Sequence, residues 1–246
     1  MTMPIDINCD MGESGDALAL KNDEEILNYV TSINIACGYH AGNHTIMHNT
    51  VRNAIRKNVR IGAHPGYPDL EGFGRRNMDV SAQEIYNMIV YQVGALQAFV
   101  AVEMGVLHHV KPHGALYNQS ANNIEKATAI VNAVYDLNPA YVLYCLAGSE
   151  MVNIAKAKGL RVFEEVFSDR HYNEDGTLVS REEPNALIHS EEEMLVHVKG
   201  IFTANEVMSV QQKKIHLSAQ TLCIHGDGPH ALAFAKKIYA LRQQIG

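Results

Sequence analysis

Histidines and an aspartate occur in this sequence at spacings that suit a metal site. His40 and His44 are four residues apart where a predicted strand gives way to a helix, so both imidazoles could lie on one helix face. Together with Asp10 they could bind one divalent metal ion, because imidazole and carboxylate groups are common ligands of such ions. In the alternative interpretation, Asn43 is the N-cap of a solvated helix and His44 lies in its first turn.

Other titratable residues are suited to acid–base chemistry. His64 and His113 each stand between a predicted strand and a turn that contains glycine or proline. An imidazole held there can act as a general acid or base, whereas a structural histidine would donate to a loop carbonyl. The remaining histidines, His109 among them, are interpreted as surface or packing residues. The candidate catalytic residues are Asp10, His40, His64, His113 and Asp227.

Cations stand at several predicted strand ends. Lys111 and Arg170 are placed to bind a carboxylate or phosphoryl group, although a structural salt bridge between Asp169 and Arg170 or its neighbours is the alternative. The segment GFGRR could fold over the same site as a lid or could be a simple turn. The candidate residues for binding substrate or phosphate are Lys111, Asp169, Arg170, Arg75, Arg76 and His225.

These motifs alternate with β-rich runs and with longer segments of helical period, which is the pattern of βα units. Seven units in 246 residues predict one α/β domain over residues 1–246, a distorted (β/α) barrel of about seven parallel strands. A doubly wound open sheet is the alternative, and in either fold ligands bind at the carboxyl ends of the strands. The predicted strands are Ile5–Cys9, Ser32–Ala36, Val59–Ala63, His109–Lys111, Tyr141–Leu146, Leu160–Val166 and Thr221–Ile224.

Local signals mark several helix starts. Ser81 with Glu84, and Ser190 with Glu193, each have the spacing of a capping box. Pro229 fits the first turn of the last helix, where its missing N–H costs nothing. The four cysteines are widely separated and form no CxxC motif, so we expect reduced and mostly buried thiols.

Composition excludes several classes of protein. A net charge of −7 without a cluster of Lys and Arg argues against a nucleic-acid partner. The N-terminus has no signal-peptide pattern and the longest apolar stretches fall short of a membrane span, so we expect a cytoplasmic protein. Neither GxxxxGK[ST] nor GxSxG occurs, so neither a P-loop nucleotide site nor an ordinary serine hydrolase is predicted.

A series of motifs along nearly the whole chain resembles the LamB/YcsF family. They are IDINCDMGES, NIACGYHAG, IGAHPGYPDLEGFGRR, YQVGAL, HVKPHGALYN, EEVFSDRHYNEDGTLVSR and TLCIHGDGPHA, in this order. The resemblance implies a barrel related to the glycoside hydrolase/deacetylase superfamily. It also implies an ATP-dependent 5-oxoprolinase activity that opens 5-oxo-L-proline to L-glutamate, with Mg²⁺ expected to accompany ATP, and two partner subunits, B and C.

One position departs from the family pattern. The family usually reads HAGDP where this chain has HAGNH, so a metal role for His44 would not be a family trait. Two other functions fit the residues: a stand-alone carbohydrate deacetylase that uses a divalent metal, and a non-catalytic subunit that binds substrate for its partners.

Overall fold

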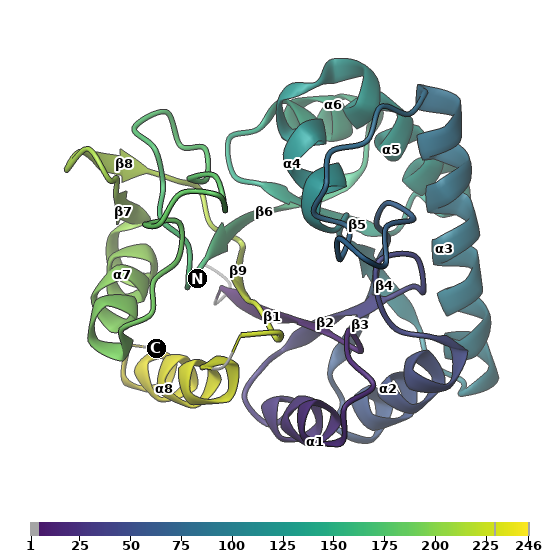
Figure 1. Cartoon of the computed structure of the whole chain (residues 1–246), viewed down its shortest axis with the longest axis horizontal. Helices are drawn as coiled ribbons and strands as arrows, with labels where there is room; N and C mark the ends of the chain where they lie inside the picture. Colours follow the sequence, from purple (N-terminus) through teal and green to yellow (C-terminus); the bar gives the residue numbers. More distant parts are fainter. Residues whose placement is uncertain (1–4, 229, 246) are drawn as a thin grey trace.

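Seven parallel strands close into a barrel in the computed structural model, which describes residues 5–228 and 230–245 (Figure 1). Neighbouring strands follow one another in chain order, and the last strand closes the barrel between the sixth and the first. The predicted barrel is confirmed and the open sheet is wrong. In order around the barrel, the strands are β1 (Asp6–Met11), β2 (Ser32–Ala36), β3 (Arg60–His64), β4 (Leu107–Val110), β5 (Val142–Leu146), β6 (Arg161–Phe167) and β9 (Thr221–Ile224).

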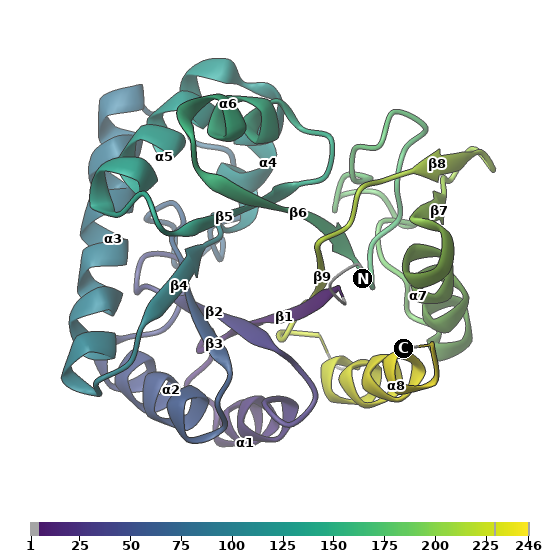
Figure 2. The same cartoon turned by 180° about the vertical axis from the view of Figure 1, so that it is seen from behind.

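Helices surround the strands on the outside, as the views from front and back both show (Figures 1 and 2). The β6–β9 connection is the longest and carries an antiparallel pair, β7 (Glu206–Met208) and β8 (Lys214–His216), that the sequence did not predict. The helices are α1 (Ala17–Ile26), α2 (His44–Arg56), α3 (Ala82–Val102), α4 (Gly114–Asn122), α5 (Ile124–Leu137), α6 (Glu150–Lys158), α7 (Glu191–Ala204) and α8 (Ala231–Ile245).

Among the described residues, side-chain caps fix five helix starts, those of α1, α2, α3, α5 and α7. Ser81 and Glu84 form the predicted capping box, and Asn43 accepts hydrogen bonds from two backbone N–H groups at the start of α2. The second predicted box is only half formed, since Ser190 accepts from the backbone of Glu193. Pro229 lies outside the described residues.

By length and composition alone, helix α3 could cross a membrane. This contradicts the expectation that every apolar stretch is too short to do so. Helix α3 packs against α5 and α2 on the outside of the barrel. One face is fully buried there, formed by Ile85, Ile89, Val93, Leu96 and Val100. Its apolar character is thus accounted for by the layer between barrel and helices.

The inside of the barrel is polar, whereas the layer between strands and helices is apolar. Strand β1 shows the division, because successive side chains of a strand point to opposite faces. Ile7 belongs to the apolar core cluster, while Asn8 and Asp10 hydrogen-bond across the barrel interior. The four cysteines are free and buried, as predicted. The barrel therefore presents its polar side chains toward one axis, and those near the carboxyl ends of the strands build the site.

Candidate functional site

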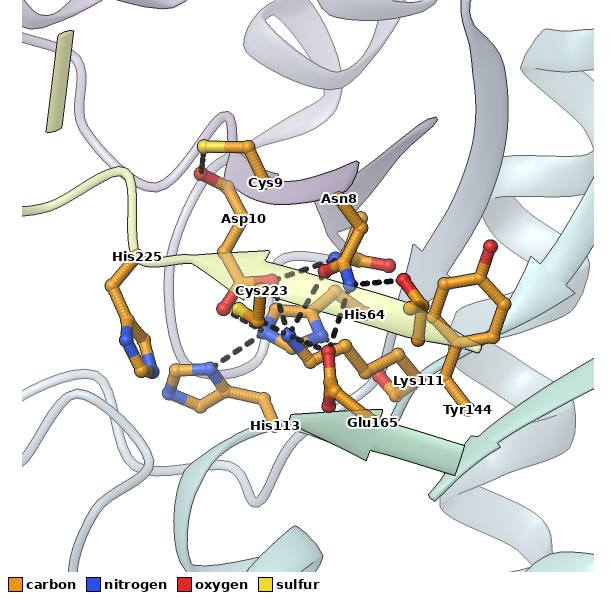
Figure 3. Close-up of polar contacts among 12 residues, drawn as sticks. Asn8, Cys9, Asp10, His64, Lys111, His113, Tyr144, Glu165, Cys223 and His225 are labelled. Carbon is orange, nitrogen blue, oxygen red and sulfur yellow. Dashed lines mark hydrogen bonds and ion pairs between the residues drawn. The ribbon is translucent and has the colours of Figure 1, made fainter. Parts of the chain in front are cut away.

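Lys111 is the centre of the polar interior, at the carboxyl end of β4 (Figure 3). Its Nζ lies 2.9 Å from a carboxylate oxygen of Asp10 and 2.9 Å from one of Glu165. The same Nζ is 3.0 Å from the Cys223 sulfur and 3.3 Å from Asn8 Oδ1. Burial opposes the charge of Lys111, but Asp10 and its other neighbours outweigh burial and hold its pKa well above the usual value.

A second layer of polar side chains supports this ion pair from deeper in the barrel. Asn8 donates to Glu165 at 3.0 Å and to Thr221 at 2.7 Å. Asn34 donates to Asp10 at 2.8 Å, and His109 donates to Asn34 at 2.8 Å while its ring stacks on a tyrosine. Because nearly every buried polar group has a partner, the positions of Asp10 and Lys111 are fixed from below.

Four residues from four strand ends form a histidine cluster, defined here as Glu13, His40, His64 and His113. One oxygen of Glu13 is 3.2 Å from His40 Nε2, 3.4 Å from His113 Nδ1 and 3.9 Å from His64 Nε2. His64 Nε2 is also 2.9 Å from His113 Nδ1 and 3.4 Å from Asp10. Burial raises the pKa of Glu13 and lowers the pKa values of His40 and His113.

The carboxyl ends of the barrel strands form the mouth of the barrel. Cationic side chains and their partners line the side of this mouth that faces the histidine cluster. His225 donates to Asp169 at 2.9 Å, and its other ring nitrogen accepts from Arg181 at 3.0 Å. Arg75 and Asp227 form an ion pair of 2.6 Å between the loops that follow β3 and β9. Arg170 and Arg181 both face the cavity at the mouth. Burial and then the nearby Arg181 lower the pKa of Arg170 to about 10.

The cavity between these two groups is small, about 30 Å³. Its walls include Asp10, His64 and His113 on one side and Arg75, Arg170 and Arg181 on the other. A space of that size holds a water molecule but no amino-acid-sized ligand. The arrangement places acid–base groups opposite cations, which suits hydrolysis of an anionic substrate once the mouth opens.

Comparison with known proteins places this chain among relatives of matching length. The model of the LamB/YcsF family matches residues 5–246. This chain belongs to the LamB/YcsF family. The A subunit of 5-oxoprolinase from Bacillus cereus (strain B4264) is 53% identical over 98% of this chain and 96% of its own. The corresponding protein of Brevibacillus brevis is 53% identical over 95% of this chain and 92% of its own.

A solved structure agrees with the fold of this LamB/YcsF protein. The crystal structure of the lactam utilization protein from Thermus thermophilus superposes with a TM-score of 0.91 at 40% identity. The match covers 98% of this chain and 97% of the other. At that similarity the barrel and its connections are shared over the matched part of the chain.

The structure of this family member brings most of the candidate residues together at the mouth. Asp10, His40, His64, Lys111 and His113 lie in the ion-pair network and the histidine cluster described above. Arg75, Asp169, Arg170, His225 and Asp227 surround the other side of the cavity.

Two candidates do not reach the site. His44 is the exposed first residue of α2 and contacts the neighbouring Thr45, so the set of Asp10, His40 and His44 is not assembled. His40 precedes the helix, and the four-residue helical spacing therefore does not apply to the pair. Arg76 is 62% exposed and binds Asp69 in its own loop.

Other candidates have different partners from those expected. Lys111 lines the cavity, but two carboxylates already neutralise it, so it is not a free cation for a substrate anion. Asp169 pairs with His225, and Arg170 donates to the backbone oxygens of Val179 and Ala186. Asp169 therefore forms its ion pair with His225 and not with Arg170.

Several residues of the site were not predicted. Glu13 lies inside the first quoted motif, two residues beyond β1, and could have been found as a further strand-end carboxylate. Asn8 lies within β1, where the alternation of Asp6, Asn8 and Asp10 was an available signal, whereas Glu165 lies within β6, which shows no such alternation. Cys223 and Arg181 gave no signal, because the contacts that place them involve distant segments.

Proposed function

We propose that this chain acts as the A subunit of a cytoplasmic ATP-dependent 5-oxoprolinase, together with partner subunits B and C. The observation that carries the proposal is the 53% identity with the A subunit of a 5-oxoprolinase across nearly the full length of both chains. The acid–base groups and cations around one cavity support a catalytic role for this chain.

The reaction consumes one 5-oxo-L-proline, one ATP and two water molecules, and yields L-glutamate, ADP and phosphate. The amide C–N bond of the ring breaks, an oxygen from water joins the carbonyl carbon, and the ring nitrogen takes up protons as it becomes an amine. A five-membered lactam is stabilised by amide resonance, so phosphorylation of its oxygen by ATP would make the carbon a better electrophile. The site must then hold an anion and activate a water molecule.

The side chains on the two walls of the cavity can divide these tasks. Asp10 lines the cavity, so its carboxylate can pass a proton to or from a water molecule or the leaving nitrogen, and His64 lies 3.4 Å from it. Arg170 and Arg181 crowd two positive charges together, and an anion between them would relieve that repulsion. We assign them to the substrate carboxylate or the transferring phosphoryl group.

Substrate entry requires the mouth to open. The 2.6 Å ion pair between Arg75 and Asp227 joins the loops that follow β3 and β9, beside a cavity that is too small for 5-oxoproline. Arg75 also lies over the ring of Phe73, 4.7 Å from its centroid, so the two side chains would move with the same loop. We infer that this loop opens for substrate and that Mg-ATP enters the same assembly.

The test is release of glutamate from 5-oxoproline and ATP by this chain mixed with subunits B and C. The complete mixture is expected to form glutamate and ADP in equal amounts, and omission of this chain should abolish the reaction. Asp10→Asn should lower kcat by roughly 10²–10⁴-fold, as loss of an acid–base group does. Arg76→Ala is the matched control and should retain activity, because Arg76 lies outside the cavity.

Two results would contradict this assignment. A complete mixture without ATP-dependent glutamate would exclude the substrate. Full activity in Asp10→Asn would instead favour a subunit that only binds substrate for its partners.

A further inference from the structure

The facing nitrogens of His64 and His113 present an unusual arrangement of hydrogen-bonding groups (Figure 3). His64 Nδ1 is 2.8 Å from the backbone oxygen of Lys111, and His113 Nε2 is 2.8 Å from that of Phe73. A carbonyl oxygen can only accept, so each of these nitrogens must carry the ring hydrogen. In neutral rings, the remaining nitrogens, His64 Nε2 and His113 Nδ1, are then both acceptors, yet they lie only 2.9 Å apart.

The surroundings add negative charge at the same point. An oxygen of Glu13 lies 3.4 Å from His113 Nδ1 and 3.9 Å from His64 Nε2, and Asp10 lies 3.4 Å from His64 Nε2. All of these atoms are buried or nearly so. Acceptors that converge in a buried space require a positive charge between them, and either a proton or a metal ion can supply it.

The distances favour a metal ion. A circle through Glu13 Oε1, His64 Nε2 and His113 Nδ1 has a radius of about 2.0 Å, which is the length of a bond from Zn²⁺ to nitrogen or oxygen. The two outer N–H groups donate to backbone carbonyls, as metal-bound imidazoles commonly do. We propose that Glu13, His64 and His113 bind one divalent transition metal ion, of the class to which Zn²⁺ belongs.

His40 is a positioning residue in this proposal, although it belongs to the same cluster. Its ring is stacked on His113 at 3.7 Å with an angle of 5° between the planes. Parallel rings at that separation cannot both direct an in-plane lone pair at one ion. His40 Nε2 instead lies 3.2 Å from Glu13 and can donate to it, while buried Nδ1 has no partner among the described residues.

Two glycines make room for the stacked rings. A Cβ atom at Gly66 would lie 2.8 Å from His40 Nδ1. A Cβ atom at Gly74 would lie 2.7 Å from His40 Cβ and 2.9 Å from His113 Cδ2. Only glycine permits the two loops to press this closely on the cluster. The backbone therefore holds these rings in place before any ion arrives.

The ion would keep open coordination positions toward the cavity. His64 and His113 line that cavity, and three protein ligands leave room for water, as in catalytic zinc sites. The proposal concerns metal binding alone and does not depend on the lactam substrate. Its test therefore needs no activity measurement.

The experiment uses the full chain after a chelator has removed bound metal. Titration with Zn²⁺ in a calorimeter should show one site per chain, and Co²⁺ as a probe should give visible absorption bands. Glu13→Gln keeps the size of the side chain and should weaken binding at least 100-fold, whereas His40→Ala should weaken it about 10–100-fold. His44→Gln is the matched control and should bind as tightly as the unaltered chain, since His44 is exposed and outside the cluster.

Circular dichroism and melting curves establish that each variant is folded. X-ray absorption at the zinc edge of the unaltered chain needs no variant and should count two imidazoles with only nitrogen and oxygen neighbours. Absence of stoichiometric binding would overturn the proposal and leave a proton between His64 and His113. A sulfur neighbour would overturn it as well, because it would place the ion in the group of Asp10, Cys223 and His225.

Discussion

Replacement of Lys111 by methionine tests whether the cation at the barrel axis holds the site together. Lys111 and its two carboxylate partners, Asp10 and Glu165, are each less than 5% exposed. A methionine side chain is similar in length to that of lysine, but Lys111→Met leaves two buried negative charges without their cation. Breaking a buried ion pair in this way costs about 3–5 kcal/mol. For a chain of this size, that corresponds to a melting temperature lower by roughly 6–20 °C.

The chain offers a matched control in the ion pair of Glu164, the residue before Glu165 in β6. Glu164 pairs with Lys156 at 2.8 Å, but the Lys156 side chain is 56% exposed. Lys156→Met should therefore cost only about 0–1 kcal/mol. The assay is urea unfolding of both variants, with the loss read from the transition midpoint at unchanged slope. Adding Glu165→Gln to Lys111→Met should recover part of the loss. If Lys111→Met costs no more than Lys156→Met, the reasoning about buried charge is refuted.

Two further predictions concern a partly buried carboxylate in α1 and the packing of the loop that follows β3. Burial raises the pKa of Asp23 to about 6, although the hydrogen bond from the Gly12 N–H lowers it. The folded state therefore holds the proton more tightly than the unfolded chain, and it loses stability as pH rises from about 4 to 6. Asp23→Asn should be more stable than the unaltered chain at pH 8, by up to about 3 kcal/mol, and equal to it below pH 4, in melting curves across that range. Gly74 has a φ of +65°, and a Cβ atom there would lie 2.7 Å from the His40 side chain. Gly148 has a similar φ of +74° but open surroundings. Gly74→Ala should therefore cost about 1–3 kcal/mol more than Gly148→Ala. Equal urea midpoints for the two alanine variants would contradict the close packing.

The barrel was predictable because its strands and their polar ends recur along the chain. Ser32–Ala36 and Thr221–Ile224 were predicted with their observed bounds, and the bounds of the other five strands differ by at most two residues. The strand ends were informative because parallel strands bring their carboxyl ends to one mouth. His64 and His113 could therefore be placed in one site although 49 residues separate them.

Partner choice inside the barrel was not predictable in the same way. Lys111 and Glu165 come from β4 and β6, which are not neighbours, so no local spacing relates them. The predicted metal ligands Asp10, His40 and His44 are not assembled for a different reason. That prediction assumed that the helix includes His40. Asn43 caps α2 and the helix begins at His44, so the two imidazoles diverge.

The separation of an apolar outer layer from a polar interior explains how this fold can maintain the site. Burying Asp10, Glu165 and Lys111 costs solvation, and replacing a buried ion pair by well-packed apolar side chains is often neutral, so such pairs are weak evidence of stability. The apolar faces of strands such as β1 and helices such as α3 supply the stabilisation instead. A change in the interior therefore acts first on geometry and charge, and a change in the outer layer acts first on folding. Variants from the two layers should separate in any assay that measures both unfolding and ligand binding.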